Sequence, residues 1–177
     1  DSEQWWKVGD IVSTLKVQNI QHTNGTSGIT VSSGGIITQP AIPCCQLRLT
    51  TSNAQDTSNP YTTTGTDIRF DRIEINQGNC YSESTGRFTV PVAGIYEVRC
   101  HFLSDNQTST NSQISVFKNG TAFHRGFQSV DNQHVELHAH ALVECVAGNY
   151  ITVQLDQGNI YISDDGVYSS FFVRLVG

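Results

Sequence analysis

The sequence contains no methionine, only four prolines and few charged residues of either sign. Charged residues make up 15% of the 177 positions, and Lys and Arg nowhere form a run. A net charge of −6 without a basic cluster excludes the electrostatic surface that nucleic acid or an anionic membrane would require. No stretch approaches the roughly 20 apolar residues of a membrane-spanning helix. We therefore expect no nucleic-acid partner and no insertion into a membrane.

Cysteine motifs are also missing. The chain has five cysteines, an odd number, and none stands in the Cys-x-x-Cys spacing of a zinc site. Cys44 and Cys45 are adjacent and poorly placed to bond with each other. Cys100 and Cys145 lie in apolar, strand-like segments, where small buried thiols are expected. We predict no disulfide framework, which suits folding in a reducing cytoplasm.

Catalytic motifs are absent as well. The sequence has no nucleophile elbow, no His-Glu-x-x-His motif and no glycine-rich phosphate loop. Asp71 and Glu74 are carboxylates that strand spacing does not force into a common cleft. We therefore expect a protein that is not an enzyme, and we assign it no catalytic residue and no cofactor.

What the sequence does contain, from Pro40 onward, is a series of strand-like segments separated by turn signals, without a helical period. The segments read CCQLRLT, DIRFDRIEIN, GRFTVPVAGIYEVRCHFLS, SQISVFKNG, TAFHRGFQ, HVELHAHALVEC, NYITVQLD and YSSFFVRLVG. Asn119-Gly120 is a dipeptide typical of tight hairpins, and Pro91 predicts either a break between strands or an edge position. This pattern indicates an all-β sandwich or jelly roll of about eight to ten strands over residues 40–177.

Residues 1–39 differ from the rest and predict an attachment arm or linker. Two short strands, GITV and GIIT, stand among Gly, Ser and Thr and bury little unless they pair with a larger partner. Trp5 and Trp6 are costly to leave in water, so we predict that they anchor the arm to a partner; folding back onto their own domain is the alternative. The N-terminus lacks the charged and apolar regions of a signal peptide. Because the chain has no methionine, even at position 1, we expect a processed or trimmed N-terminus, which leaves a lost leader open.

Several segments together carry a family resemblance. They are YSESTGRFTVPVAGIYEVRCHF, SVFKNGT, ALVECVAGNYITVQL and the closing GVYSSFFVRLVG. The matching positions are Tyr81, Gly86, Phe88, Pro91, Gly94, Tyr96, Lys118, Asn119, Gly120, Gly148, Phe171 and Phe172. Over residues 40–177 the chain resembles the globular head of the complement q subcomponent, a relative of tumour necrosis factor. The resemblance implies a ten-stranded jelly roll, a homotrimer about a threefold axis, and binding in place of catalysis. A collagen-like stalk, usual in the animal members, is absent.

The segment VELHAHALVEC raises the question of a metal site. Strand alternation places Val135, Leu137, Ala139, Ala141, Val143 and Cys145 on one apolar face and Glu136, His138, His140, Leu142 and Glu144 on the other. If the strand lines the threefold axis that the resemblance implies, His138 and His140 form rings of imidazoles there. A metal ion, an interface without metal and an ordinary exposed face all stay open, and we assign no metal ligand.

Two kinds of loop have alternative interpretations. Asp156, Asp164 and Asp165 lie in acidic turns, and some members of the resembling family bind calcium through acidic loops; a solvated turn is the plainer interpretation. The loops TTSNAQDTSNPYTTTGTD and SDNQTSTNSQ are neutral and polar. They suit either recognition of a sugar or protein, or solubility alone.

The linker TNGTSGITVSSGGIITQPAIP is similar to segments that precede such heads in bacteriophage tail-fibre or decoration proteins. We therefore predict a non-enzymatic phage virion protein on the virion surface, assembled in the host cytoplasm. Its arm would bind a capsid or tail protein, and its head a host-surface glycan or protein. A secreted complement-type recognition protein is the alternative. Candidates for the trimer interface are Tyr96, His138, His140, Phe171 and Phe172.

Overall fold

A computed structural model describes residues 17–23, 25, 27–53, 55–105, 111–129 and 133–177. The chain divides into two compact units, one up to Ala41 and the other Ile42–Gly177. The described residues form strands and turns, and no helix among them is long and apolar enough to cross a membrane. Trp5 and Trp6 lie outside the described residues, so their predicted anchoring role stays a prediction.

The first unit holds a small antiparallel sheet in the order β1-β2-β3. Its strands are β1 (Asn19–Gln21), β2 (Ser27–Val31) and β3 (Ile37–Thr38). The sequence predicted β2 and β3 but not β1. Ile20, Ile36 and Ile37 are exposed within the chain, as expected of strands too short to enclose a core of their own.

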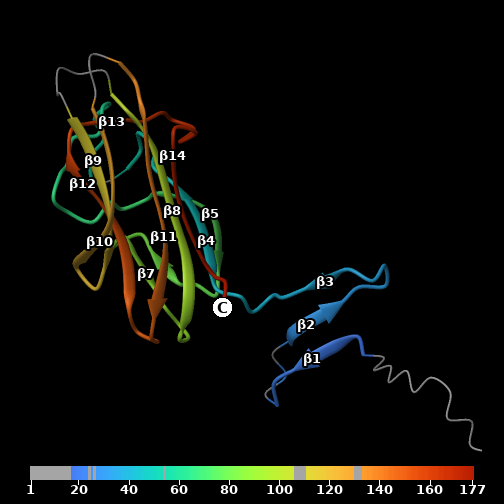
Figure 1. Ribbon diagram of the computed structural model, residues 1–177. Coiled ribbons are helices and arrows are strands. Elements are labelled where there is room, and N and C mark those ends of the chain that lie inside the picture. The colour runs from blue at the N-terminus through green and yellow to red at the C-terminus, as the bar shows by residue number, and fades with distance from the viewer. Residues whose placement is uncertain (1–16, 24, 26, 54, 106–110, 130–132) are drawn as a thin grey trace, which may run out of the picture. The chain divides into compact units, whose positions relative to one another are not determined.

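The second unit is built from two antiparallel sheets that face each other (Figure 1). Its strands are β4 (Cys44–Arg48), β5 (Arg72–Gln77), β6 (Tyr81–Ser82), β7 (Arg87–Thr89), β8 (Gly94–Ser104), β9 (Asn111–Lys118), β10 (Thr121–Ser129), β11 (Glu136–Cys145), β12 (Tyr150–Gln157), β13 (Ile160–Tyr161) and β14 (Ser169–Leu175). The five-stranded sheet runs β10-β9-β12-β7-β6. The six-stranded sheet runs β11-β8-β14-β4-β5, with β13 paired to β8. The predicted all-β jelly-roll sandwich is confirmed.

Aromatic side chains fill the space between the sheets. The ring of Phe70 stacks on Phe171 at a centroid distance of 5.2 Å and on Phe102 at 6.0 Å. Phe88 meets Tyr96 edge to face at 5.9 Å. All five rings are fully buried. Because each buries a large apolar area, this cluster contributes much of the hydrophobic stabilisation of the sandwich.

The turn chemistry follows the sequence closely. Asn119 and Gly120 have φ angles of 51° and 75° and join β9 to β10, as predicted for a tight Asn-Gly hairpin. Pro91 lies between β7 and β8, at the predicted break. All five cysteines are free thiols, and Cys100 and Cys145 are buried as predicted. Burial raises the pKa of Cys100 to about 12, so this thiol stays protonated and unreactive at neutral pH.

Candidate functional site

His138 and His140, two of the residues predicted at a subunit interface, lie on the outward face of the six-stranded sheet. On β11 the side chains of Leu137, Ala139 and Val143 point into the core, whereas those of His138 and His140 are exposed. The predicted alternation is therefore confirmed. The strand pairs with β8, so each exposed residue of β11 lies beside an outward-facing residue of β8.

Tyr96 and Phe171 do not reach this outward face. Both are completely buried in the core of a single chain, and the Tyr96 hydroxyl donates a hydrogen bond to the Val92 carbonyl at 2.9 Å. Neither side chain has surface to offer a neighbouring protomer, which corrects their expected place at an interface. The reason is strand parity, since Phe172, one residue further on, faces outward and is partly exposed.

Glu97 is the centre of a charged network on the outward face. Its side chain is only 8% exposed, although it carries a carboxylate. It accepts hydrogen bonds from the Nε atoms of Arg99 at 2.8 Å and Arg174 at 3.1 Å. Nε2 of His140 lies 3.3 Å from the same carboxylate. The hydrogen bond from Arg99 is the main cause that lowers the pKa of Glu97, with the charges of both arginines adding to it against the opposing effect of burial.

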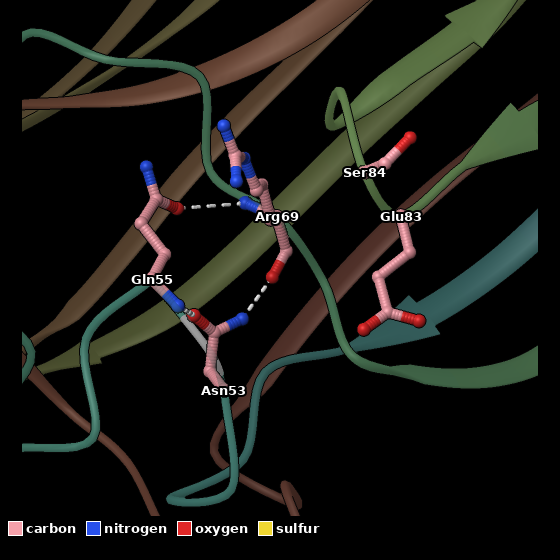
Figure 2. A pocket seen from close by; sticks show the side chains of 5 residues that line it. All are labelled: Asn53, Gln55, Arg69, Glu83 and Ser84. Carbon is pink, nitrogen blue, oxygen red and sulfur yellow. Dashed lines mark hydrogen bonds between the residues drawn. The ribbon is translucent and has the colours of Figure 1, made fainter.

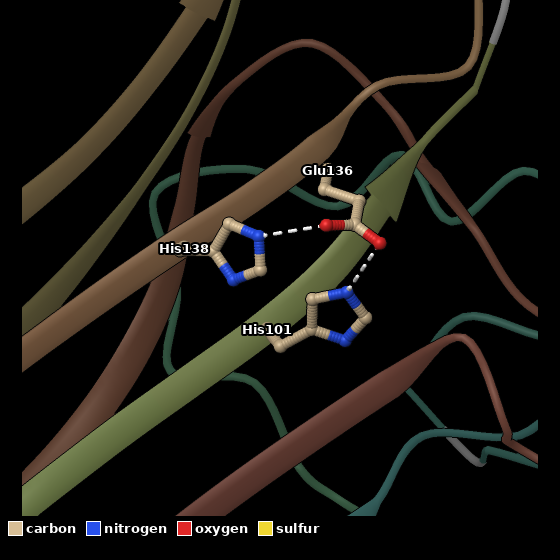
Figure 3. A group of neighbouring side chains, drawn as sticks. All are labelled: His101, Glu136 and His138. Atoms are coloured by element: carbon tan, nitrogen blue, oxygen red, sulfur yellow. Dashed lines mark hydrogen bonds and ion pairs between the residues drawn. The ribbon is translucent and has the colours of Figure 1, made fainter.

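A second cluster lies next to this network and consists of His101, Glu136 and His138 (Figure 3). His138 Nε2 is 3.0 Å from one Glu136 carboxylate oxygen, and His101 Nε2 is 3.8 Å from the other. The two imidazole rings are tilted by 31° with centroids 4.9 Å apart. Burial, followed by the proximity of His138, lowers the pKa of His101, which Glu136 opposes. The carboxylate thus lies between two imidazoles.

The sequence singled out His138 and His140 as the pair of interest, and the structure separates them. His140 belongs to the Glu97 network, whereas His138 lies directly opposite His101 of β8. Alternation within one strand cannot identify His101, because this residue lies on the neighbouring strand. Antiparallel pairing of VRCHF with HAH in the observed register would have found it.

Apolar side chains are exposed at both edges of the same sheet. Leu142 on edge strand β11 is 61% exposed. On the opposite edge strand, β5, Ile73 and Ile75 are 45% and 48% exposed. Exposed apolar residues gathered on sheet edges are typical of protein contacts.

A polar hollow of about 350 Å³ lies at the loops and is lined by Asn53, Gln55, Arg69, Glu83 and Ser84 (Figure 2). Internal hydrogen bonds hold its wall: the Arg69 backbone N–H donates to Gln55 Oε1 at 3.0 Å, and the Gln55 N–H donates to Asn53 Oδ1 at 2.8 Å. The side-chain amide of Asn53 donates to the Arg69 carbonyl. The Arg69 guanidinium and the Glu83 carboxylate have no hydrogen bond to a described residue, so both are available to a ligand.

A family model of the C1q domain matches residues 52–173 of the chain. The chain belongs to the C1q domain family. It is 43% identical over 53 residues to mouse complement C1q and tumor necrosis factor-related protein 9. That match covers 30% of this chain and 15% of the mouse protein.

Solved structures support the fold of the C1q domain. The globular domain of zebrafish complement 1qA protein matches with a TM-score of 0.60 and 11% identity, over 76% of this chain and 98% of the zebrafish chain. Eiger TNF from S. frugiperda matches with the same TM-score and identity, over 77% of this chain and 94% of the Eiger chain. Murine APRIL matches with a TM-score of 0.56 and 13% identity, over 76% of this chain and 99% of the murine chain. These are animal proteins, so the predicted phage setting draws no support from them.

The carboxylates of the acidic segments of this C1q domain are already engaged in hydrogen bonds within the chain. Asp165 accepts hydrogen bonds from the Ser163 hydroxyl at 2.5 Å and the Val167 N–H at 3.3 Å. Asp156 lies in β12 and not in a turn, and it accepts one from the Gln113 amide of neighbouring strand β9 at 2.8 Å. Among the described residues, the acidic turns do not bring three ligand atoms together. The solvated-turn interpretation is thus the one that the contacts favour.

The loop beside the hollow is organised by Asp56. Its carboxylate accepts backbone N–H bonds from Ser58 at 3.0 Å, Thr62 at 2.8 Å and Thr63 at 3.1 Å. Partial burial by itself would raise the pKa of Asp56. These bonds, with those from the Ser58 and Thr63 hydroxyls, outweigh burial and hold the pKa well below its usual value.

Asp56→Asn is expected to lower the free energy of unfolding by about 1–2 kcal/mol at pH 7, because an amide is a weaker acceptor than a carboxylate. A folded-state pKa below the unfolded value of 3.8 means that the contribution is present above pH 4 and fades as pH falls below it. Urea unfolding at pH 7 and pH 2.5 measures the loss of stability and its dependence on pH, with Glu83→Gln as the control. An equal difference between Asp56→Asn and wild type at the two pH values would contradict this assignment.

Proposed function

We propose that the chain is a non-enzymatic recognition head that assembles as a homotrimer and binds polar ligands through its loops. The observation that carries this proposal is the pair of exposed apolar edges on the sheet of a C1q domain, with Leu142 at one edge and Ile73 and Ile75 at the other. An interface that repeats about a threefold axis is heterologous, so it needs two different patches that meet head to tail. The two edges of this sheet supply such patches.

The charged face between the edges fits the same arrangement. Glu97 is already neutralised by Arg99 and Arg174, so covering this network leaves no unpaired carboxylate. Phe172, in the middle of the sheet, adds apolar surface beside the Arg174 guanidinium, whose central carbon is 5.9 Å from the ring centroid. Phe172, His138 and His140 therefore stay candidates for the interface.

Recognition is assigned to the polar hollow and the loops around it. The Arg69 guanidinium and the Glu83 carboxylate, neither of which has a hydrogen bond to a described residue, offer donors and an acceptor on one concave surface. A second hollow of about 430 Å³ shares Gln55, Arg69 and Ser84 with the first, which extends the polar surface. Such a surface suits a hydroxyl-rich ligand such as a glycan, and three copies on one trimer turn weak contacts into avidity.

For the biological setting we favour secreted, complement-type recognition, since the C1q family model and the mouse relative support it. The phage virion setting of the sequence-based prediction is the second candidate. The free thiols of all five cysteines favour a reducing compartment for folding, and hence this second candidate. Both settings share the same trimeric, non-catalytic head.

The test compares wild type with Leu142→Asp and Ile75→Asp, one on each edge strand. Wild type is expected to have a native mass three times the chain mass of 19.4 kDa. Each variant is expected to dissociate to the monomer, because an aspartate buried in an interface loses its hydration. Retention on immobilised glycans should drop at least tenfold on dissociation, through loss of avidity.

Val92→Asp is the matched control, because Val92 is 46% exposed and lies between β7 and β8, on neither edge strand. It should keep the trimer mass. A wild-type monomer at every concentration, or a trimer that survives both edge substitutions, would overturn the assembly. A trimer whose glycan retention equals that of the monomers would overturn multivalent recognition while leaving the assembly intact.

A further inference from the structure

We propose that His101, Glu136 and His138 form a binding site for a zinc ion on the outward face of the six-stranded sheet. Among the described residues, this is the one place where ligand atoms from three His, Cys, Asp or Glu side chains lie within 4.8 Å of one another. All three come from one chain, so the site goes beyond the proposed function and does not depend on trimer formation.

The backbone places the three side chains. His138 of β11 and His101 of β8 are direct partners in the antiparallel register, so their side chains leave the same face of the sheet side by side. Glu136 precedes His138 by two residues and therefore projects from that same face. A site built on two paired strands is held more firmly than one built on loops.

The distances are close to those of a coordinated ion. Zinc lies about 2.0–2.2 Å from its nitrogen and oxygen ligands, so ligand atoms in a tetrahedral site are about 3.3 Å apart. Here the Glu136 oxygens are 3.0 Å from His138 Nε2 and 3.8 Å from His101 Nε2. Figure 3 shows the carboxylate between the two rings. Small side-chain rotations would bring all three donors onto one ion.

The type of donor selects the ion. Two imidazole nitrogens and one carboxylate oxygen match zinc and related transition ions, whereas calcium takes six to eight oxygen ligands. Three protein ligands leave at least one coordination position open. The side chains of His138 and Glu136 are 59% and 66% exposed, so this position can accept water or a group from a partner surface.

His140 marks the limit of the site and provides the control. It lies on the same strand and face, two residues beyond His138, and it is 57% exposed like His138. Its nearest acid, Glu97, is held by Arg99 and Arg174, so a cation there would have to displace two guanidinium groups. A metal should therefore select His138 over His140.

The experiment is calorimetric titration of the chelator-treated full chain with ZnCl₂. We expect one ion per chain, and a loss of affinity of at least about tenfold in His138→Ala and in Glu136→Gln, since even ligand-supporting residues contribute that much. His140→Ala should bind zinc as wild type does. CaCl₂ should produce no binding.

Cobalt substitution tests the ligand set without any variant that might unfold. Co²⁺ bound at this site should give visible bands of a low-coordinate ion with nitrogen and oxygen donors. A thiolate charge-transfer band would instead assign the metal to cysteines such as Cys44, and would overturn the proposal. Equal zinc affinity of wild type and His138→Ala would overturn it as well, as would the same loss in His140→Ala.

Discussion

Phe171→Ala is expected to lower the free energy of unfolding by about 3–5 kcal/mol, the range for a large aromatic side chain removed from a core. Phe171 is fully buried and stacks on Phe70 at 5.2 Å, so alanine would leave a cavity between the two sheets. Strands β4 and β8 pair with β14 on both sides and limit its collapse into that cavity. Chemical denaturation followed by intrinsic fluorescence measures the change.

Phe172→Ala is the matched control, one residue further along the same strand. Because Phe172 faces outward, its loss should cost the single chain far less and should act on assembly instead. Denaturation at several protein concentrations separates the two effects, since the stability of an oligomer depends on concentration. If Phe172→Ala proved as costly as Phe171→Ala under conditions where wild type is monomeric, the core assignment of β14 would be wrong.

The contrast between these two residues shows what the sequence could predict. Alternation within HAHALV correctly separated core from surface on β11. In YSSFFVRL, Phe171 shares a face with Ser169 and Val173, whereas Phe172 shares a face with Ser170 and Arg174. Local alternation therefore favours Phe171 as the buried residue, although the family resemblance placed both phenylalanines at an interface. The pairing of β14 with β8 and β4 then fixes which sheet face turns toward the core.

Only the part of the candidate metal site that lies on one strand could be predicted from the sequence. His138 and Glu136 were visible as neighbours on one strand, but His101 lies 37 residues earlier and meets them only through the register of β8 with β11. The Glu97 network likewise joins β8, β11 and β14. The loop around Asp56 was expected to be polar and exposed. Its set of backbone hydrogen bonds depends on the folded path of the chain and could not be predicted from composition.

Gly126→Ala is expected to lower the free energy of unfolding by about 3 kcal/mol, at the upper end of the usual range for overpacking. Gly126 is a buried residue of β10, and a Cβ atom there would lie 2.0 Å from the His138 carbonyl oxygen and 2.7 Å from its carbonyl carbon. These are backbone atoms, so no side-chain rotation relieves the overlap. The substitution must push β10 away from β11, where the edges of the two sheets meet.

Gly148→Ala separates this steric effect from the general cost of replacing a glycine. Gly148 has a φ angle of 85° and no atom within 4 Å of the added Cβ, so its substitution costs only the left-handed backbone strain of about 1 kcal/mol. Gly126 lacks a positive φ, so nearly all of its expected cost is contact with His138. Urea denaturation of the two variants should therefore differ by about 2 kcal/mol. Equal costs would mean that β10 and β11 separate freely, and that the His138 backbone is not fixed by the packing of the two sheets.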